Sequence, residues 1–320
     1  MPAHAITPEP LRGRVFTNAD ARAAGLTFRQ VAWAVRSGRW TALRRGVYVE
    51  TSVLRAADEM RRHLMFAGAA ALTHRGALVS RMSAAVAHDV PLLAPLARPV
   101  VTVDHRPALS SIHRADVVIH REPLDDVDRA AVAGYAVTSP ARLVIDLARS
   151  ASFDQAVVAA DTLLHRGAVS EADLAAAVTR LGHLARIEQA HAVVAFADPK
   201  AESPLESISR VGMRDHHLPR PATQQVICDA LGFVARVDFL FVEECTVGLA
   251  DGLTKYVVSD DVGARDPTAQ LRAEKLQQQR LEDLGLSVVR WGWTEAVNDF
   301  GGVARRLRAA FAHAQRRRAG

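Results

Sequence analysis

Four residues in the last third of the chain have the types and spacing of a site for metal-dependent phosphodiester hydrolysis. Glu206 falls on an expected helix, Asp238 falls inside an expected strand, and Asp251 ends the following hairpin, with Lys255 just beyond. Metal-dependent nucleases place acidic groups at the ends of adjacent strands, where they hold Mg²⁺ between the attacking water and the scissile phosphate. The pattern predicts Asp238 and Asp251 as Mg²⁺ ligands and all four residues as catalytic candidates.

A structural interpretation of the same carboxylates stays open. Asp238 has apolar neighbours, and a carboxylate without a partner is expensive in such surroundings, so it could pair with Arg236 or with a neighbouring strand. Asp251 and Gly252 could form an ordinary hairpin turn. The spacing alone does not choose between a metal site and these structural roles.

Cysteine and histidine suggest no further metal site. Cys228 and Cys245 lack the spacing of zinc ligands and are expected to be buried thiols in a reducing compartment. The histidines of the middle region are scattered without ligand spacing, so they are expected to be ordinary surface or core residues.

Length and hydropathy bound the class of protein. A chain of 320 residues is long enough for two or three domains. It contains no run of about 18 uncharged apolar residues, and Met1 to Pro10 lack a basic-then-apolar signal pattern. We therefore expect a cytoplasmic protein with no membrane segment.

Positive charge is concentrated at the N-terminus. Residues 1–50 carry eight arginines against three acidic residues, a net charge of +5, and the remaining 32 basic and 32 acidic residues cancel. Attraction to phosphate is therefore expected mainly in this segment. Only three of the 40 basic residues are lysines, so part of the arginine content can reflect genome composition.

The same segment has the pattern of a winged helix-turn-helix. Thr17 and Thr27 are N-cap residues of two short helices, the first stopped by Gly25 and the second by Ser37 and Gly38. A β-rich stretch follows and is broken at a basic turn, as in a hairpin wing. The second helix is expected in the major groove and the wing near the DNA backbone, which gives the DNA-binding candidates Arg29, Gln30, Arg36, Arg39, Arg44 and Arg45. In the alternative, the two helices merely pack and their arginines are solvated.

The order of elements predicts an α/β protein of several domains. We expect a winged helix-turn-helix over residues 1–52 and a mixed α/β domain over 53–198. A third α/β domain over 199–320 would run helix, three strands, helix, strand, and a basic C-terminal helix. Nothing in the middle region by itself indicates chemistry.

Nearly the whole chain resembles a known arrangement. The segment from Phe16 to Tyr48, closing in Leu43-Arg-Arg-Gly-Val-Tyr48, resembles the winged helix of AbiEi-type antitoxins of type IV toxin-antitoxin systems. Val137-Thr-Ser-Pro-Ala-Arg142, with Asp146-Leu-Ala148, resembles the segment that follows it in those proteins. The resemblance implies double-stranded DNA as a partner, and a cognate toxin gene or product.

The C-terminal part is similar to an uncharacterised domain related to very-short-patch-repair endonucleases, of the PD-(D/E)XK superfamily. The motifs that carry this similarity are Ala201-Glu-Ser-Pro-Leu-Glu206, Val237-Asp-Phe239, Asp251-Gly-Leu-Thr-Lys-Tyr256 and Glu274-Lys275. The similarity implies a restriction-endonuclease-like fold with Glu206 as the helix acid, Asp238 as the core metal ligand and Asp251 as an acid or positioning group. One position departs from the pattern, since Leu249 stands where the family usually has Glu, and leucine cannot bind Mg²⁺.

Three functions follow from these patterns. The first is a DNA-binding regulator of the AbiEi antitoxin type, able to act as a homodimer, whose endonuclease-like domain is degenerate at Leu249. The second is an active Mg²⁺-dependent DNA endonuclease targeted by its winged helix. In the third, the winged helix contacts a protein partner in place of DNA.

Overall fold

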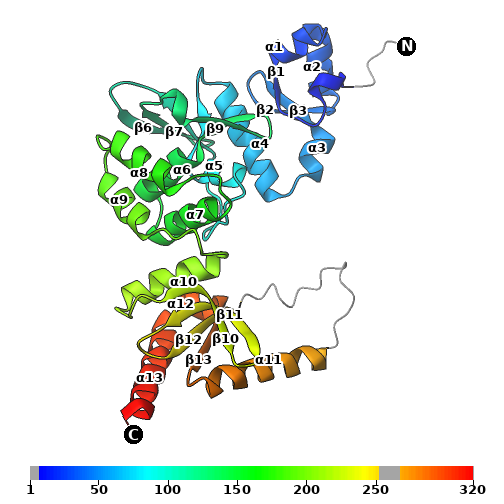
Figure 1. Ribbon diagram of the computed structural model, residues 1–320. Coiled ribbons are helices and arrows are strands. Elements are labelled where there is room, and N and C mark those ends of the chain that lie inside the picture. The colour runs from blue at the N-terminus through cyan, green and yellow to red at the C-terminus, as the bar shows by residue number, and fades with distance from the viewer. Residues whose placement is uncertain (1–6, 252–266, 320) are drawn as a thin grey trace. The chain divides into compact units, whose positions relative to one another are not determined.

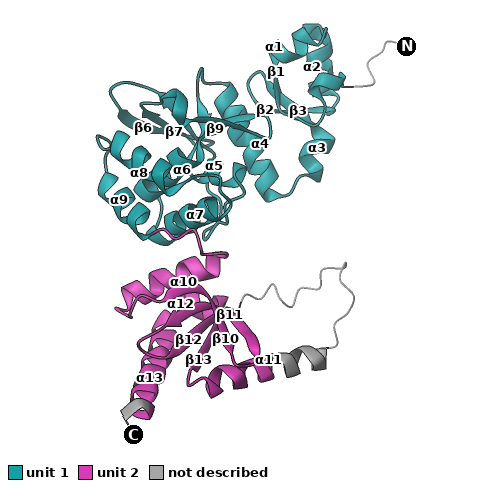
Figure 2. Ribbon diagram, viewed as in Figure 1, with its two compact units in different colours: residues 1–196 teal, residues 197–320 magenta. Residues whose placement is uncertain are grey.

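The computed structural model describes residues 7–251 and 267–319, which form two compact units (Figure 2). Unit 1 spans Met1–Phe196 and unit 2 spans Ala197–Gly320. Each unit combines sheets with packed helices (Figure 1), so the expected mixed α/β, multi-domain fold class is confirmed. The three expected domain boundaries stay a prediction.

The N-terminal module of unit 1 is a small winged helix. Its elements are η1 (Glu9–Leu11), β1 (Phe16–Thr17), α1 (Asn18–Ala23), α2 (Phe28–Arg36), β2 (Trp40–Arg44) and β3 (Val47–Glu50). The strands form an antiparallel sheet in the order β1-β3-β2. Phe16 and Trp40 meet edge to face at 4.7 Å in the core that holds the two helices on this sheet.

Local sequence explains where the two helices begin. Thr17 and Thr27 are N-caps, and each forms a reciprocal capping box with the residue three positions later, Asp20 or Gln30. These boxes satisfy backbone N–H groups that have no partner within the helix. Gly25 and Gly38 have φ of 83° and 73°, the left-handed conformation that glycine adopts without steric penalty at a helix end.

A six-stranded mixed sheet with helices packed around it forms the rest of unit 1. Its strands run in the order β6-β7-β5-β4-β9-β8, with bounds β4 (Leu78–Val79), β5 (Val100–Asp104), β6 (Leu109–His113), β7 (Val118–Glu122), β8 (Arg129–Val132) and β9 (Tyr135–Thr138). The helices are α3 (Thr51–Ala56), α4 (Glu59–Leu72), α5 (Arg81–Ala87), α6 (Pro140–Ser150), α7 (Phe153–His165), α8 (Glu171–Arg180) and α9 (Ile187–Phe196), with η2 (Asp126–Asp128) before β8.

The motif around Arg142 and Asp146 is structural. The Arg142 side chain is fully buried and donates to Asp146 at 2.9 Å, to Asp128 at 3.2 Å and to Glu122 at 2.9 Å. Arg149 also donates to Glu122, at 3.0 Å. Because buried charges are tolerated only when they are paired and hydrogen-bonded, this cluster fixes α6 against the sheet and needs no catalytic explanation.

Unit 2 is a four-stranded sheet with helices on both faces. Its elements are α10 (Pro204–Asp215), β10 (Ala222–Asp229), β11 (Gly232–Phe241), β12 (Thr246–Asp251), α11 (Pro267–Asp283), β13 (Ser287–Gly292), α12 (Trp293–Asn298) and α13 (Phe300–Ala319). The order is β10-β11-β12-β13, antiparallel except for the parallel β12–β13 pair.

Alternation along β12 separates the two faces of this sheet. A Cβ on Gly248 would meet the Trp291 ring at 2.6 Å, so on this face the sheet needs glycine to pack closely. The Trp291 indole N–H donates to Ser209 of α10 at 2.8 Å, which places α10 here. Leu249, one residue on, packs in the apolar cluster that includes Leu281 of α11, because successive strand residues face opposite sides.

Two sequence-based expectations meet the structure here. The prediction of buried thiols is wrong for Cys228, which is exposed because it lies near the end of the β10–β11 hairpin, and Cys245 is half-buried. Within the described residues, no helix is long and apolar enough to cross a membrane.

Candidate functional site

Helix α2 presents an exposed surface of aromatic and basic side chains. Its amphipathic pattern buries Val31 and Ala34 against the winged-helix core. The opposite side exposes the residues that we call the α2 surface: Phe28, Arg29, Trp33 and Arg36, with Arg39 just after the helix. Phe28 is 79% exposed and Trp33 is 39% exposed, so two large aromatic side chains face solvent on the same helix as the arginines.

The basic and aromatic groups of this surface lie against each other. The guanidinium carbon of Arg39 lies 5.2 Å from the centroid of the Trp33 ring, within the range of a cation–π contact. Arg29, Trp33 and Arg36 are spaced by four and three residues, so they share one side of the helix. This is the side on which an α-helix would read a major groove.

Gln30 has a structural role in the same helix. Its side-chain oxygen accepts from the Thr27 backbone N–H at 2.7 Å and from the Thr27 hydroxyl at 2.8 Å. The carbonyl end of the amide is thereby engaged in the cap, and only the NH₂ end could meet a base. As a DNA-contacting residue, Gln30 stays a prediction.

The hairpin places its two arginines differently. Arg45 is exposed at the turn, whereas the side chain of Arg44 is only 14% exposed and pairs with Asp116 at 2.8 Å. Asp116 belongs to the turn between β6 and β7, so the wing is tied to the middle sheet. The sequence contains no signal for this pair, which joins positions far apart in the chain.

In unit 2, two of the predicted catalytic residues, Glu206 and Asp238, both contact the side chain of Gln224, which was not among the predicted site residues. The Gln224 side-chain NH₂ donates to Glu206 at 2.8 Å and is 3.4 Å from Asp238. Asp238 also accepts from the Ala250 backbone N–H at 2.8 Å, and Glu206 accepts from Ser203 at 2.8 Å. Glu206 is buried, so this cluster is a built feature of the fold.

The other predicted residues do not complete a cation site. Asp251 pairs with Arg290 at 3.0 Å, and Lys255 lies outside the described residues. Leu249 is only 9% exposed and lies within the apolar cluster that contains Leu281.

This donor set does not fit Mg²⁺. The ion prefers several oxygen ligands in octahedral geometry, whereas here an amide NH₂ group lies between the two carboxylates. Across the described residues, no group of three or more histidine, cysteine, aspartate or glutamate side chains could hold a metal ion.

Two details of the cluster escaped sequence reasoning. Arg236 pairs with Glu202 at 2.6 Å, and Asp238 has its partners on the neighbouring strands, in the Gln224 amide and the Ala250 N–H, which is the second form of the structural alternative. Gln224 has φ of 52°, an unusual conformation for a residue within a strand, which no local signal predicted.

Two short helices joined by a tight turn and followed by a β-hairpin define a winged-helix module, here with an exposed basic and aromatic helix. Residues 10–51 match the family model described as "Transcriptional regulator, AbiEi antitoxin". The match lies on this module and supports an antitoxin-like DNA-binding regulator. It does not reach the middle sheet or unit 2.

Similar proteins match a longer part of the chain than the family model does, but their names state no activity. The chain is 28% identical over 158 residues to the uncharacterized proteins Rv2248 and MT2308 from two strains of Mycobacterium tuberculosis. The alignment covers 49% of this chain and 55% of each relative, so the chain spans about half the length of the curated relatives it matches. The crystal structure of the RV2827C protein from Mycobacterium tuberculosis is 16% identical, covering 58% of this chain and 77% of that one at a TM-score of 0.32.

Proposed function

We propose that this protein is a DNA-binding transcriptional regulator of the AbiEi antitoxin type, and that α2 is its recognition helix. The observation that carries the proposal is the α2 surface, where Arg29 and Arg36 flank an exposed Trp33 on one side of a short helix. Arginine is the side chain that most often reads guanine in the major groove, and apolar groups contact the thymine methyl. The family match over residues 10–51 points the same way.

The same proposal includes a homodimer, a DNA site at the protein's own promoter, and a cognate toxin. A single winged helix reads a short half-site, so a homodimer on a two-fold site would gain affinity from its second copy. The DNA would then be the promoter of the protein's own operon, and the operon would also encode a cognate toxin.

Unit 2 in this proposal is an endonuclease-like domain without cleavage activity. Leu249 supplies no ligand, Asp251 is paired with Arg290, and the Gln224 amide contacts both remaining carboxylates. Removing a carboxylate from a site that works by positioning a metal costs orders of magnitude in rate. In this proposal, a domain of this kind would be retained because it binds DNA without cutting it.

Replacing Arg29 or Arg36 with alanine tests the recognition helix. Each substitution removes a cation from the α2 surface, and a lost bidentate contact to a base weakens binding by about 1–3 kcal/mol, or roughly 5- to 150-fold. Fluorescence anisotropy with the upstream duplex measures this loss and its dependence on salt. Arg186→Ala, also exposed and lying between α8 and α9 of unit 1, is the control of equal charge and should bind as the native protein does. Unchanged affinity in both α2 variants would overturn the proposal.

A plasmid assay tests the absence of cleavage. Supercoiled DNA incubated with the protein and Mg²⁺ or Mn²⁺ should shift in a gel but stay uncut, with the same result in chelator. Asp238→Ala should shift DNA equally well, because it lies outside the α2 surface. Metal-dependent nicking that disappears in Asp238→Ala would instead establish an endonuclease.

A further inference from the structure

A cavity of about 440 Å³ lies where the winged helix meets the middle sheet in unit 1. Its walls come from three places in the chain: the segment leading into β1, helix α4 with the loop that follows it, and the β8–β9 hairpin. Most of its lining is apolar, including Val15, Leu72 and Leu78. The volume is within the range of small-molecule sites, which are about 300–1,000 Å³.

Tyr135 forms part of one wall, where its ring packs against a glycine in helix α4. Gly68 lies in the interior of α4, where glycine destabilises a helix by roughly 0.5–1 kcal/mol relative to alanine. A Cβ at this position would overlap the Tyr135 ring, so the glycine allows the ring to lie directly on the helix. Burial raises the pKa of the Tyr135 phenol, which therefore stays protonated and able to donate a hydrogen bond. Its hydroxyl has no hydrogen-bond partner among the residues the structure describes.

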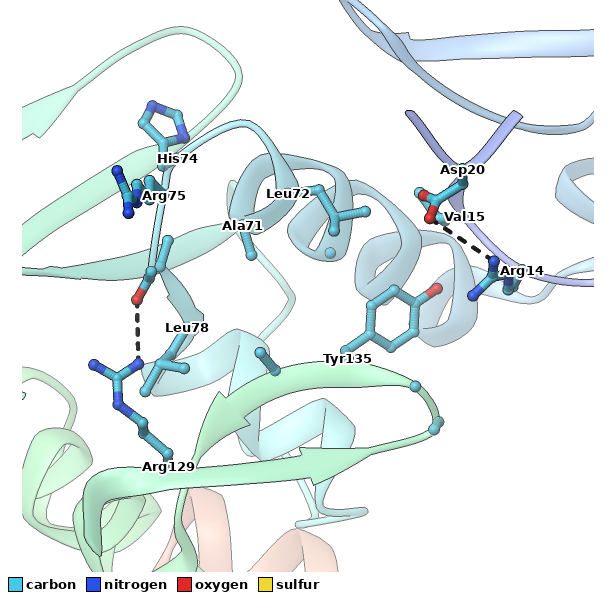
Figure 3. Close-up of a pocket in the computed structure, with 16 residues that line it drawn as sticks. Arg14, Val15, Asp20, Ala71, Leu72, His74, Arg75, Leu78, Arg129 and Tyr135 are labelled. Atoms are coloured by element: carbon cyan, nitrogen blue, oxygen red, sulfur yellow. Dashed lines mark hydrogen bonds and ion pairs between the residues drawn. The ribbon is translucent and has the colours of Figure 1, made fainter. Parts of the chain in front are cut away.

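Three arginines from separate segments line the same cavity. Figure 3 shows Tyr135 between Arg14 on one side and Arg75 and Arg129 on the other. The lining contains one acidic residue, Asp20, whose distance of 4.0 Å from Arg14 is at the limit of an ion pair. The cavity is therefore lined by three cations and one anion.

The three guanidinium groups are weakly engaged by the protein. Arg129 reaches the Gly76 carbonyl at 3.4 Å and Asp126 at 3.8 Å, both long contacts. Arg75 has no ion-pair or side-chain hydrogen-bond partner among the described residues. Each guanidinium carries five N–H donors, so most of these donors remain available to a bound anion.

We propose that this cavity binds a small organic anion with an apolar body, such as an aromatic carboxylate. The carboxylate would be held by Arg75 and Arg129, whose planar groups match its geometry, while the ring would lie on Tyr135 and the aliphatic wall. The apolar walls favour this ligand over a DNA phosphate, which carries no apolar group to contact them. The proposal goes beyond the assignment of DNA binding and does not depend on it.

Benzoate and its uncharged amide, benzamide, are suitable probes. Isothermal titration calorimetry on the full chain without DNA should show saturable benzoate binding with a Kd on the order of 1 mM, as expected for so small a ligand. Benzamide should bind at least tenfold more weakly. The double variant Arg75→Gln and Arg129→Gln should lose at least tenfold in benzoate affinity, while Arg114→Gln, an exposed arginine outside this cavity, should match the native protein.

A second measurement places the ligand. With 3-fluorotyrosine incorporated at the three tyrosines of the chain, benzoate should shift the ¹⁹F resonance of Tyr135, assigned by its loss in Tyr135→Phe, and leave that of Tyr48 unchanged. Thermal unfolding of each variant verifies that it is folded. Absence of benzoate binding at 20-fold excess over the expected Kd, equal affinity for benzamide, or a shift confined to Tyr48 would overturn the proposal. Because no DNA is present, none of these outcomes bears on the proposed regulator.

Discussion

At the scale of single residues, Glu122 is the acceptor that holds three buried arginines together. It accepts from Arg81 and Arg149 at 3.0 Å and from Arg142 at 2.9 Å. Burial by itself would raise the pKa of Glu122, but hydrogen bonding by Arg149 and the surrounding arginine charges outweigh it and lower the pKa to about 2. The carboxylate is therefore charged throughout the physiological range.

Glu122→Gln should strongly destabilise unit 1. The change leaves three buried guanidiniums short of a counter-charge, and breaking a buried pair costs about 3–5 kcal/mol. Urea unfolding followed by circular dichroism measures the loss. Glu188→Gln, at an exposed position on α9, is the control and should change stability by less than about 0.5 kcal/mol. Equal stability of the two variants would show that the arginine cluster does not depend on Glu122.

Acid should destabilise unit 1 in two windows. In the folded protein, burial and the nearby Arg81 charge lower the pKa of His120 from its ordinary value of 6.5 to about 4. Between these two pH values the unfolded chain binds a proton on His120 that the folded protein does not bind. Stability therefore falls as pH drops from 6.5 to 4. For Glu122 the ordinary pKa is 4.5, and its contribution is lost from 4.5 down to about 2. Burial lowers the pKa of His63 as well, so His120→Asn should reduce the first window, and not abolish it, in melting curves recorded from pH 7 to 3. An undiminished first window in the variant would assign it to other groups.

At the scale of elements, the capping boxes at Thr17 and Thr27 stabilise the first turns of α1 and α2. Thr27→Ala removes both hydrogen bonds of the Thr27 hydroxyl, one donated to the Gln30 side-chain oxygen and one accepted from the Gln30 backbone N–H, while the Thr27 backbone N–H still donates to Gln30. The loss should destabilise α2 by about 1 kcal/mol. Hydrogen exchange of the amides in residues 28–36 should then quicken several-fold, while Thr27→Ser should retain native protection. Native exchange rates in Thr27→Ala would mean that packing alone holds the helix.

At the scale of the whole molecule, the wing's engagement with the middle sheet links the winged helix to the rest of unit 1. Asp116→Asn should release Arg44 from its pair, so DNA affinity should rise a few-fold and the salt dependence should steepen by about one counterion. Glu171→Gln, an exposed change of equal charge on α8, is the control. The same gain in both variants would be a general charge effect and would exclude a specific restraint by Asp116.

The sequence by itself determined the winged helix, because its signals are local. Thr17, Thr27 and the two stop glycines act within one or two helical turns, and the amphipathic spacing of α2 fixes which side it buries. The excess of arginine and the segment from Phe16 to Tyr48 also indicated the class that the family match supports. The arginines expected to touch DNA remain predictions.

Tertiary structure alone decided the interactions between distant parts of the chain. The Arg44–Asp116 pair, the Gln224 contacts to Glu206 and Asp238, and the cavity beside Tyr135 each join residues far apart in sequence. The local sequence around a carboxylate in a strand is the same whether that carboxylate binds a metal ion, an arginine or an amide. Which partner it meets depends on how the sheet and helices pack, and that packing depends on burial of apolar surface across the whole unit, which no local pattern encodes.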